Sequence, residues 1–195
     1  MRETKLQQLL DHSRRVIMAS GNARAMAAAE RVFDRLEARQ GATGAVTAQR
    51  LPVCLHNIDA ALDGLAARPS PLSEIGATFT ALEPQFAWYR RRTAQPGDEP
   101  FYSSHANAIL VGPGGLEERD DVWVGATIMA PQLVYPDHDH PPEEVYIALS
   151  RGEWWNSEMD WMEPGVGGIV YNPPGIFHAM RSHAQPLLAL WFLPI

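Results

Sequence analysis

The sequence predicts a mainly β protein, in which a helical N-terminal segment precedes a C-terminal barrel or sandwich of short strands. Apolar residues recur at helical spacing through the first third of the chain. From about Phe86 onward, short runs rich in Val, Ile, Trp and Tyr alternate with Gly, Pro and Asp turns, a pattern typical of a β-sandwich or barrel. We therefore expect a helical extension over residues 1–84 that packs on a barrel over residues 85–195.

The helical extension is expected to contain three helices. The first covers residues 6–17 and stops at Ser20-Gly21-Asn22, and the second covers residues 23–39. The third is expected near residues 57–67, and residues 72–83 then lead into the barrel. Because these helices are amphipathic, they could cap the barrel mouth, form the surface of a homodimer, or both.

Six apolar runs are examples of the expected strands of the barrel. Turn residues separate them, among them a Gly-Pro-Gly-Gly turn at residues 112–115. The charged residues at 117–121 that follow this turn are expected to form a solvated cluster, to which we attach no functional role. The six runs cover residues 108–111, 122–124, 127–129, 145–149, 168–171 and 187–192.

Composition excludes several classes of function. The chain of 195 residues is 46% hydrophobic and 20% charged, so it can bury a core. Its net charge of −7 argues against non-specific binding of nucleic acid, which requires a basic face. Cys54 is the only cysteine, so neither an intrachain disulfide nor a cysteine-based metal cluster can form. The sequence shows neither a signal peptide nor an apolar membrane span, and we expect a cytoplasmic protein without a membrane partner.

Candidate metal ligands gather in residues 135–146. His138 and His140 are two residues apart, so on a strand their side chains point the same way. Glu144 follows a Pro-Pro turn and can return to the same space, and Tyr146 shares its strand face. Imidazoles and a carboxylate together suit one divalent ion such as Zn, Fe, Mn, Ni or Co.

A further imidazole comes from a second motif. The run Asn172-Pro-Pro-Gly predicts a turn, and His178 stands just past it. On a barrel this histidine could face the first cluster. The two motifs lie about 34 residues apart.

Both motifs resemble those of the cupin superfamily, over roughly residues 105–195. The second motif fits from Gly167 through Pro173, Gly175 and His178, while Ser182 replaces its final Asn. The first motif keeps its two histidines and its glutamate but lacks the opening glycine, and its closing glycine is one residue late. The resemblance implies a small barrel, of the double-stranded β-helix or jelly-roll type, that holds a metal.

Two tyrosines flank the ligand cluster and suggest a reaction. Tyr135 precedes the histidine pair, and Tyr146 lies beside Glu144 on the strand. A divalent cation lowers the pKa of a neighbouring phenol, and a phenolate in a dry pocket is a competent base for a carbon acid. The metal can also stabilise the charge that develops on a substrate carboxylate. These parts suit removal of a proton α to a carboxylate, followed by β-elimination.

This combination is similar to the cupin-type dimethylsulfoniopropionate (DMSP) lyases, especially the DddQ-like group. The similarity rests on residues 135–146, on the Gly-Glu-Trp at 152–154, on residues 172–178 and on the order of the two parts of the chain. It implies a carbon–sulfur lyase that cleaves DMSP to dimethyl sulfide and acrylate. It also implies that His140, Glu144 and His178 bind the metal, with His138 or the Tyr146 oxygen completing the shell. The implied catalytic base is Tyr146, with Tyr135 as a second catalytic candidate.

The implied substrate is a small zwitterion with a sulfonium cation and a carboxylate. A sulfonium has no hydrogen-bond donor, so aromatic faces hold it best. Arg90-Arg91-Arg92 could attract the carboxylate, although a solvated face is the simpler interpretation. The expected substrate contacts are Tyr89, Trp123, Tyr135 and Trp191.

Other functions remain compatible with a metal-binding cupin, because fold alone does not determine function. An Fe(II)-dependent dioxygenase would also use three protein ligands and open metal positions. An isomerase acting on another small carboxylate is a further alternative. A non-enzymatic, ligand-binding cupin is the third.

Overall fold

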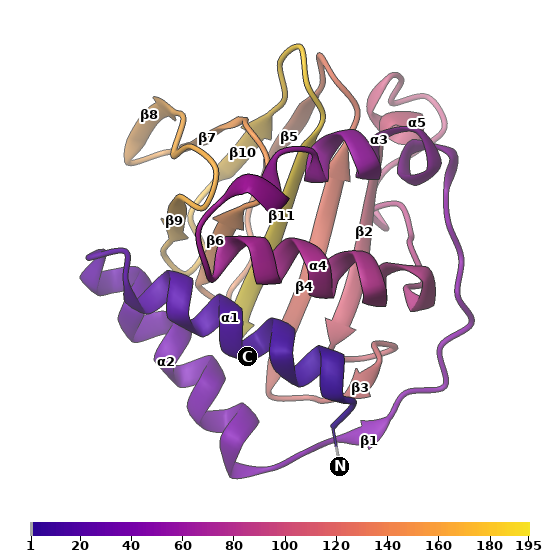
Figure 1. Ribbon diagram of the computed structural model, residues 1–195. Coiled ribbons are helices and arrows are strands. Elements are labelled where there is room, and N and C mark those ends of the chain that lie inside the picture. The colour runs from indigo at the N-terminus through magenta and orange to yellow at the C-terminus, as the bar shows by residue number, and fades with distance from the viewer. Residues whose placement is uncertain (1) are drawn as a thin grey trace.

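The computed structural model describes residues 2–195 and shows two sheets with helices against one of them (Figure 1). The larger sheet has seven strands in the order β1-β3-β2-β4-β11-β6-β9, and the smaller has four in the order β5-β10-β7-β8. The helices are α1 (Thr4–Met18), α2 (Ala23–Ala38), α3 (Pro52–Leu62), α4 (Leu72–Leu82) and the short α5 (Phe101–Ser104). The strands are β1 (Ala42–Thr43), β2 (His105–Val111), β3 (Glu117–Glu118), β4 (Val122–Met129), β5 (Val134–His138), β6 (Glu144–Ala148), β7 (Glu153–Asn156), β8 (Met159–Met162), β9 (Ile169–Asn172), β10 (His178–Arg181) and β11 (Leu187–Pro194).

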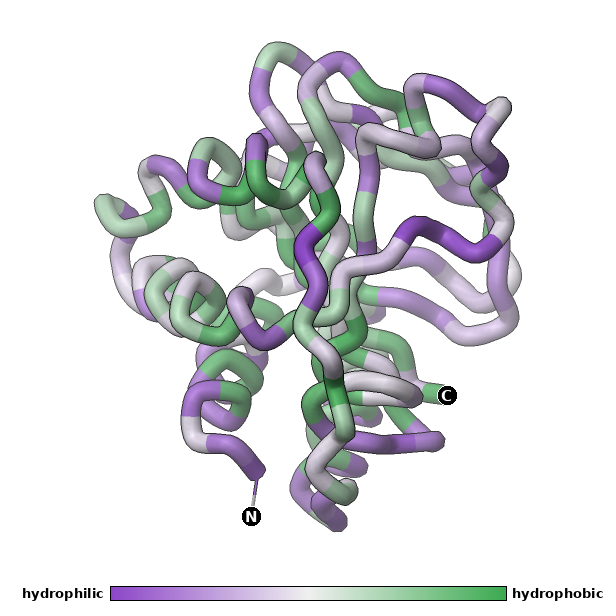
Figure 2. Tube along the Cα trace, turned by 90° about the vertical axis from the view of Figure 1, so that its right-hand side faces the viewer, coloured by the Kyte–Doolittle hydropathy of each residue, from purple (hydrophilic) through white to green (hydrophobic). Residues whose placement is uncertain are grey.

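The mainly β architecture with N-terminal helices is confirmed, although the strands form two separate sheets instead of one closed barrel. Helices α1 to α4 cover one face of the seven-stranded sheet (Figure 1). In the view turned by 90°, hydrophobic segments concentrate where these helices meet the strands (Figure 2). No helix in the described part of the chain combines the length and the apolar character that crossing a membrane requires.

The central strands of the large sheet are buried on both faces. On β11, Leu188, Leu190 and Phe192 belong to the apolar core shared with the helices. The alternate residues, including Trp191, belong to a second cluster on the other face of the sheet. Because successive side chains of a strand point to opposite faces, one apolar run serves two layers. This double burial explains why the sequence of β11 shows no alternation of polar and apolar residues.

Several expected boundaries are wrong. The third helix is α3 at Pro52–Leu62 instead of residues 57–67, because Pro52 takes the first helical position and the chain leaves the helix before Gly64, whose φ is 80°. Residues 72–83 are mostly a fourth helix. The two expected strands at residues 122–124 and 127–129 are one continuous strand, β4.

The N-terminal segment is also not purely helical. Its residues Ala42 and Thr43 form β1, which pairs with β3 at the edge of the seven-stranded sheet. This pairing requires a close approach, since a Cβ on Gly41 would lie 2.0 Å from the carbonyl oxygen of Glu118. The N-terminal segment therefore contributes to the sheet as well as covering it.

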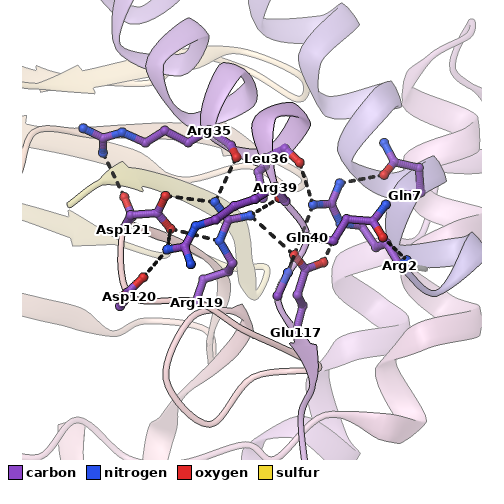
Figure 3. A network of polar contacts seen from close by, with 11 residues as sticks. Arg2, Gln7, Arg35, Leu36, Arg39, Gln40, Glu117, Arg119, Asp120 and Asp121 are labelled. Atoms are coloured by element: carbon purple, nitrogen blue, oxygen red, sulfur yellow. Dashed lines mark hydrogen bonds and ion pairs between the residues drawn. The ribbon is translucent and has the colours of Figure 1, made fainter.

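The charges at residues 117–121 are not a solvated cluster as expected, because two of them are buried (Figure 3). Glu117 receives hydrogen bonds from Arg2 at 2.5 and 3.1 Å and from the backbone of Gly41 at 2.8 Å. Arg119 donates to both carboxylate oxygens of Asp121 at 2.9 Å. Buried charges of this kind are tolerated because each is paired and hydrogen-bonded.

Arg119 also ties this network to the end of helix α2. Its guanidinium donates to the backbone carbonyl of Arg39 at 2.5 Å and to that of Arg35 at 2.9 Å (Figure 3). The last carbonyls of a helix lack partners within the helix and carry partial negative charge. The Arg119 cation therefore satisfies the carboxyl end of α2 and fixes this helix to the sheet edge.

We expect Glu117→Gln to lower the free energy of unfolding by about 3–5 kcal/mol, because it leaves the buried guanidinium of Arg2 without its carboxylate partner. Urea unfolding followed by circular dichroism measures the effect. The matched control is Glu118→Gln, at the exposed neighbouring position. Equal stability of the two variants would contradict the role assigned to Glu117.

Candidate functional site

A cavity of about 690 Å³ lies beside the inner face of the large sheet. Its wall takes residues from β2, β4, β6 and β11 of the large sheet and from β5 and β10 of the small sheet. Gln49 and the segment at residues 87–93 complete the wall, so the chain before the barrel also shapes the cavity. This volume lies within the range typical of small-molecule sites.

The predicted ligands come from three places around this cavity. His138 is the last residue of β5, and Glu144 is the first residue of β6. His140 lies in the loop between these strands, so the expectation that both histidines share one strand is wrong. The loop nevertheless brings the His140 ring back to the cluster, 5.0 Å from the His178 ring between centroids.

His178 opens β10 and stands beside the first cluster, as expected from the second motif. It is the Cα partner of His138 across the β5–β10 pair, and the two ring centroids are 4.1 Å apart. The backbone N–H of Gly175 donates to the carbonyl of His140 at 2.9 Å, which joins the turn of the second motif to the loop of the first. Gly175 has a φ of 68°, a conformation that favours glycine.

The three imidazoles are oriented by their own loops. Nδ1 of each ring lies 2.8 to 3.0 Å from a backbone carbonyl two residues away in the chain. Since a carbonyl can only accept, each Nδ1 carries a proton, which in a neutral ring leaves the lone pair on Nε2. One potential ligand atom from each of the three histidines lies within 4.8 Å of those of the other two. Histidines that bind metals are commonly oriented by such backbone hydrogen bonds.

Glu144 completes this cluster. One oxygen of its buried carboxylate lies 3.3 Å from Nε2 of both His140 and His178. Burial alone would raise the pKa of Glu144, but its contacts with His140 and then His178 outweigh burial and lower this pKa. Among the described residues, Nε2 of His178 finds no hydrogen-bond partner although it is buried. A buried lone pair without a donor is what a metal ligand requires, so the cluster is compatible with a divalent metal.

The pKa values of the other two imidazoles are shifted in opposite directions. Burial, and then the neighbouring His178, lowers the pKa of His138 to about 3, so His138 is neutral at pH 7. Burial also acts to lower the pKa of His140, but Glu144 outweighs it and raises this pKa. A neutral imidazole is the form that binds a metal, and His138 is held in that form by its surroundings.

The two tyrosines both border the cavity. Tyr146 is 2% exposed, and burial followed by the Glu144 carboxylate raises the pKa of its phenol well above the ordinary value. Burial also raises the pKa of Tyr135, which is 5% exposed. Both phenols are therefore protonated in the protein alone at pH 7, and ionisation of either requires an added positive charge.

The aromatic residues predicted to contact the substrate all border this cavity. Trp191 is 7% exposed, whereas Trp123 is 36% exposed and lies nearer to solvent. Arg92 of the arginine run is exposed, and Arg90 and Arg91 are half-buried. All three also line the cavity, and the guanidinium of Arg91 lies 5.7 Å from the centroid of the Tyr135 ring. The predicted aromatic contacts that line the cavity are Tyr89, Trp123, Tyr135 and Trp191.

Two polar residues of the wall escaped the sequence interpretation. Asn107 and Thr127 are buried Cα partners on β2 and β4, and both line the cavity. Each is a polar residue in a mostly apolar strand, which is the signal that could have identified them. His105 is also buried, and its ring stacks on Phe101 with the centroids 3.8 Å apart.

Comparison with known proteins identifies relatives of this chain. A family described as dimethylsulfoniopropionate lyase matches residues 24–189. DMSP lyase DddQ from Ruegeria pomeroyi is 33% identical over 91 residues, which are 46% of this chain and 45% of DddQ. The matched stretch thus spans less than half the length of that relative.

Solved structures share the fold of this chain. The crystal structure of DddQ from Ruegeria pomeroyi superposes with a TM-score of 0.77 at 24% identity, covering 98% of this chain and 91% of DddQ. A structure of the DMSP lyases RdDddP and RnDddQII gives a TM-score of 0.72 at 21% identity, covering 98% and 92%. The expected cupin fold with N-terminal helices is confirmed. Because the family match extends over most of its length, the chain belongs to the dimethylsulfoniopropionate lyase family.

Proposed function

We propose that this protein is a metal-dependent lyase that cleaves DMSP to dimethyl sulfide and acrylate. The observation that carries the proposal is a cluster of three oriented imidazoles and Glu144, in which His138, His140 and Glu144 line the same cavity as the buried phenol of Tyr146. The third imidazole, His178, lies 3.3 Å from the Glu144 carboxylate. Membership of the DMSP lyase family and the name of the relative DddQ support the choice of substrate.

The residues that would hold the metal are His140, Glu144 and His178, with His138 or the oxygen of Tyr146 completing the shell. Their donor set suits Zn, Fe, Mn, Ni or Co. A divalent cation bound there would supply positive charge that attracts the substrate carboxylate, stabilises charge developing beside it and lowers the pKa of Tyr146. No change of oxidation state is needed, so several of these metals are expected to support turnover.

Tyr146 acts as the base in this proposal. Its phenolate removes a proton from the carbon next to the carboxylate, and the electron pair of that C–H bond forms the new carbon–carbon double bond. The carbon–sulfur bond breaks, its electrons go to sulfur, and neutral dimethyl sulfide leaves. Burial and Glu144 raise the pKa of the Tyr146 phenol, so the positive charge of the metal would be needed to form this phenolate at pH 7.

The rest of the cavity would orient the two ends of the substrate. The aromatic faces of Tyr89, Trp123 and Trp191 border the cavity and suit a sulfonium. Arg91 supplies a positive charge, and no carboxylate of the described residues forms an ion pair with it. We propose that Arg91 attracts the anionic end. A cytoplasmic location and a homodimer stay predictions.

Purified protein with metal bound is expected to release dimethyl sulfide from DMSP in sealed vials, measured by gas chromatography of the headspace. His178→Ala is expected to lose both the metal and the activity, and His56→Ala, at an exposed histidine, to keep both. A chelator should abolish the release, and added divalent metal should restore it. No release by protein with one metal per chain would reject the substrate, and oxygen uptake would then test the dioxygenase alternative.

Tyr146→Phe is expected to lower kcat about 100- to 10,000-fold, because a positioned general base contributes acceleration of this size. The metal content, measured by mass spectrometry, serves as the control that the ligands are intact. A variant that keeps its metal and its full rate would exclude Tyr146 as the base.

Arg91→Gln is expected to raise KM for DMSP about tenfold, since a charge-assisted contact to the carboxylate is lost. The effect on kcat should be smaller, because the contact is present before and during the reaction. Arg68→Gln, at an exposed arginine outside the cavity, is the matched control. Equal KM values for the two variants would remove Arg91 from the substrate site.

A further inference from the structure

Three hydrogen bonds connect four buried side chains along the cavity wall. Nε1 of Trp191 donates to Oγ1 of Thr127 at 3.1 Å, and Oγ1 of Thr127 donates to Oδ1 of Asn107 at 2.6 Å. Nδ2 of Asn107 then donates to the phenol oxygen of Tyr135 at 3.3 Å. We call these four residues the Trp191–Tyr135 chain.

The direction of this chain is set by its first member. An indole N–H can only donate, so Thr127 accepts from Trp191. Among the described residues, Asn107 is the acceptor that the Thr127 hydroxyl reaches, and their separation of 2.6 Å is typical of an O–H···O bond. The Asn107 amide therefore presents its oxygen to Thr127 and its nitrogen to Tyr135.

At the Tyr135 end of the Trp191–Tyr135 chain, the hydroxyl proton of Tyr135 has no assigned acceptor. The Tyr135 oxygen accepts from Asn107, so its own O–H cannot point back along the chain. Within residues 2–195, no hydrogen bond from the Tyr135 hydroxyl to a protein acceptor is formed. Tyr135 lines the cavity together with Asn107 and Thr127, and Arg91 lies over its ring. An acceptor for this proton must come from a bound molecule or from water.

The packing of the strands builds this arrangement into the fold. Asn107 and Thr127 are Cα partners on β2 and β4, and β11, which carries Trp191, pairs with the other edge of β4. The Trp191 indole has room because residue 125 is a glycine, where a Cβ would lie 2.1 Å from its ring. Three adjacent strands thus hold Asn107, Thr127 and Trp191, while Tyr135 comes from β5 of the smaller sheet. The direction of the first two hydrogen bonds is therefore a fixed property of the large sheet.

We propose that Thr127 and Asn107 are positioning residues that, together with Trp191, make Tyr135 an obligate hydrogen-bond donor to a carboxylate in the cavity. The identity of the ligand rests on the proposed function. Tyr135 is then not a second base. The two tyrosines have different roles, because Tyr135 donates a hydrogen bond to the carboxylate and Tyr146 accepts the proton from carbon.

Two substitutions test the direction of the hydrogen bonds in the Trp191–Tyr135 chain. Asn107→Asp keeps the size of the side chain but replaces the donor by an acceptor, so the Tyr135 hydroxyl would turn toward residue 107. Thr127→Val removes the hydroxyl at nearly constant volume. We expect each variant, loaded with Zn²⁺, to bind propionate roughly 10- to 100-fold more weakly by isothermal titration calorimetry, the range for a hydrogen bond to a charged group.

Two controls separate positioning from a general structural effect. Thr127→Ser retains the hydroxyl and is expected to bind propionate about as tightly as the parent protein. Tyr135→Phe should weaken binding by itself, and Asn107→Asp should add nothing further in that background, because both changes remove the same hydrogen bond. Metal content and thermal unfolding of every variant show whether the site and the fold persist.

The outcomes distinguish this inference from the proposed function. If the parent protein releases no dimethyl sulfide but the variants lose propionate binding as expected, the proposed substrate is wrong, and the role proposed for the Trp191–Tyr135 chain is retained. If the parent protein is an active lyase and both variants bind propionate normally, the inference is overturned and the function stands. Additive effects of Asn107→Asp and Tyr135→Phe, or a parent protein that does not bind propionate, would also overturn it.

Discussion

The seven-stranded sheet, buried on both faces, is the constraint on which the rest of this structure depends. Each of its central strands sends one set of side chains to the helices and the alternate set to the cavity. On β6, Val145 and Ile147 pack toward the helices, whereas Glu144 and Tyr146 face the cavity. A shift of register by one residue would exchange these sets and place the carboxylate in the apolar core. The burial that stabilises the fold thus also fixes which residues can do chemistry.

Short turns, more than the strands themselves, assemble the imidazole cluster. His138 and His178 stand at the ends of neighbouring strands, and His140 lies in a loop. Hydrogen bonds from each Nδ1 to a nearby carbonyl orient the rings without help from distant side chains. A backbone hydrogen bond from Gly175 to His140 also joins the loop that carries His140 to the turn that precedes His178. Such local orientation places the ligands before any ion arrives, which lowers the entropic cost of binding.

Much of the fold and of the ligand cluster could be predicted from the sequence, because both depend on local patterns. Helical periodicity identified α1 and α2, and the spacing of the two motifs brought His140, Glu144 and His178 together. The solvated cluster expected at residues 117–121 was wrong because Glu117 pairs with Arg2, 115 residues away, and no local pattern encodes such a partner. Asn107 and Thr127 were missed for the same reason, since their role appears only when three strands lie side by side. The role of each metal ligand and the boundary at residue 84 stay predictions.

The place of β11 in the sheet has a consequence for how the chain acquires its structure during synthesis. This strand follows all the others in the described sequence, yet it lies between β4 and β6 and pairs with both. Until the ribosome has delivered it, β4 and β6 have exposed edges, and helix α2 lacks the strand that it contacts most. Unpaired edges of this kind invite association with other chains. The nascent protein therefore passes most of its synthesis with an incomplete sheet, and its dependence on chaperones should be greatest in that interval.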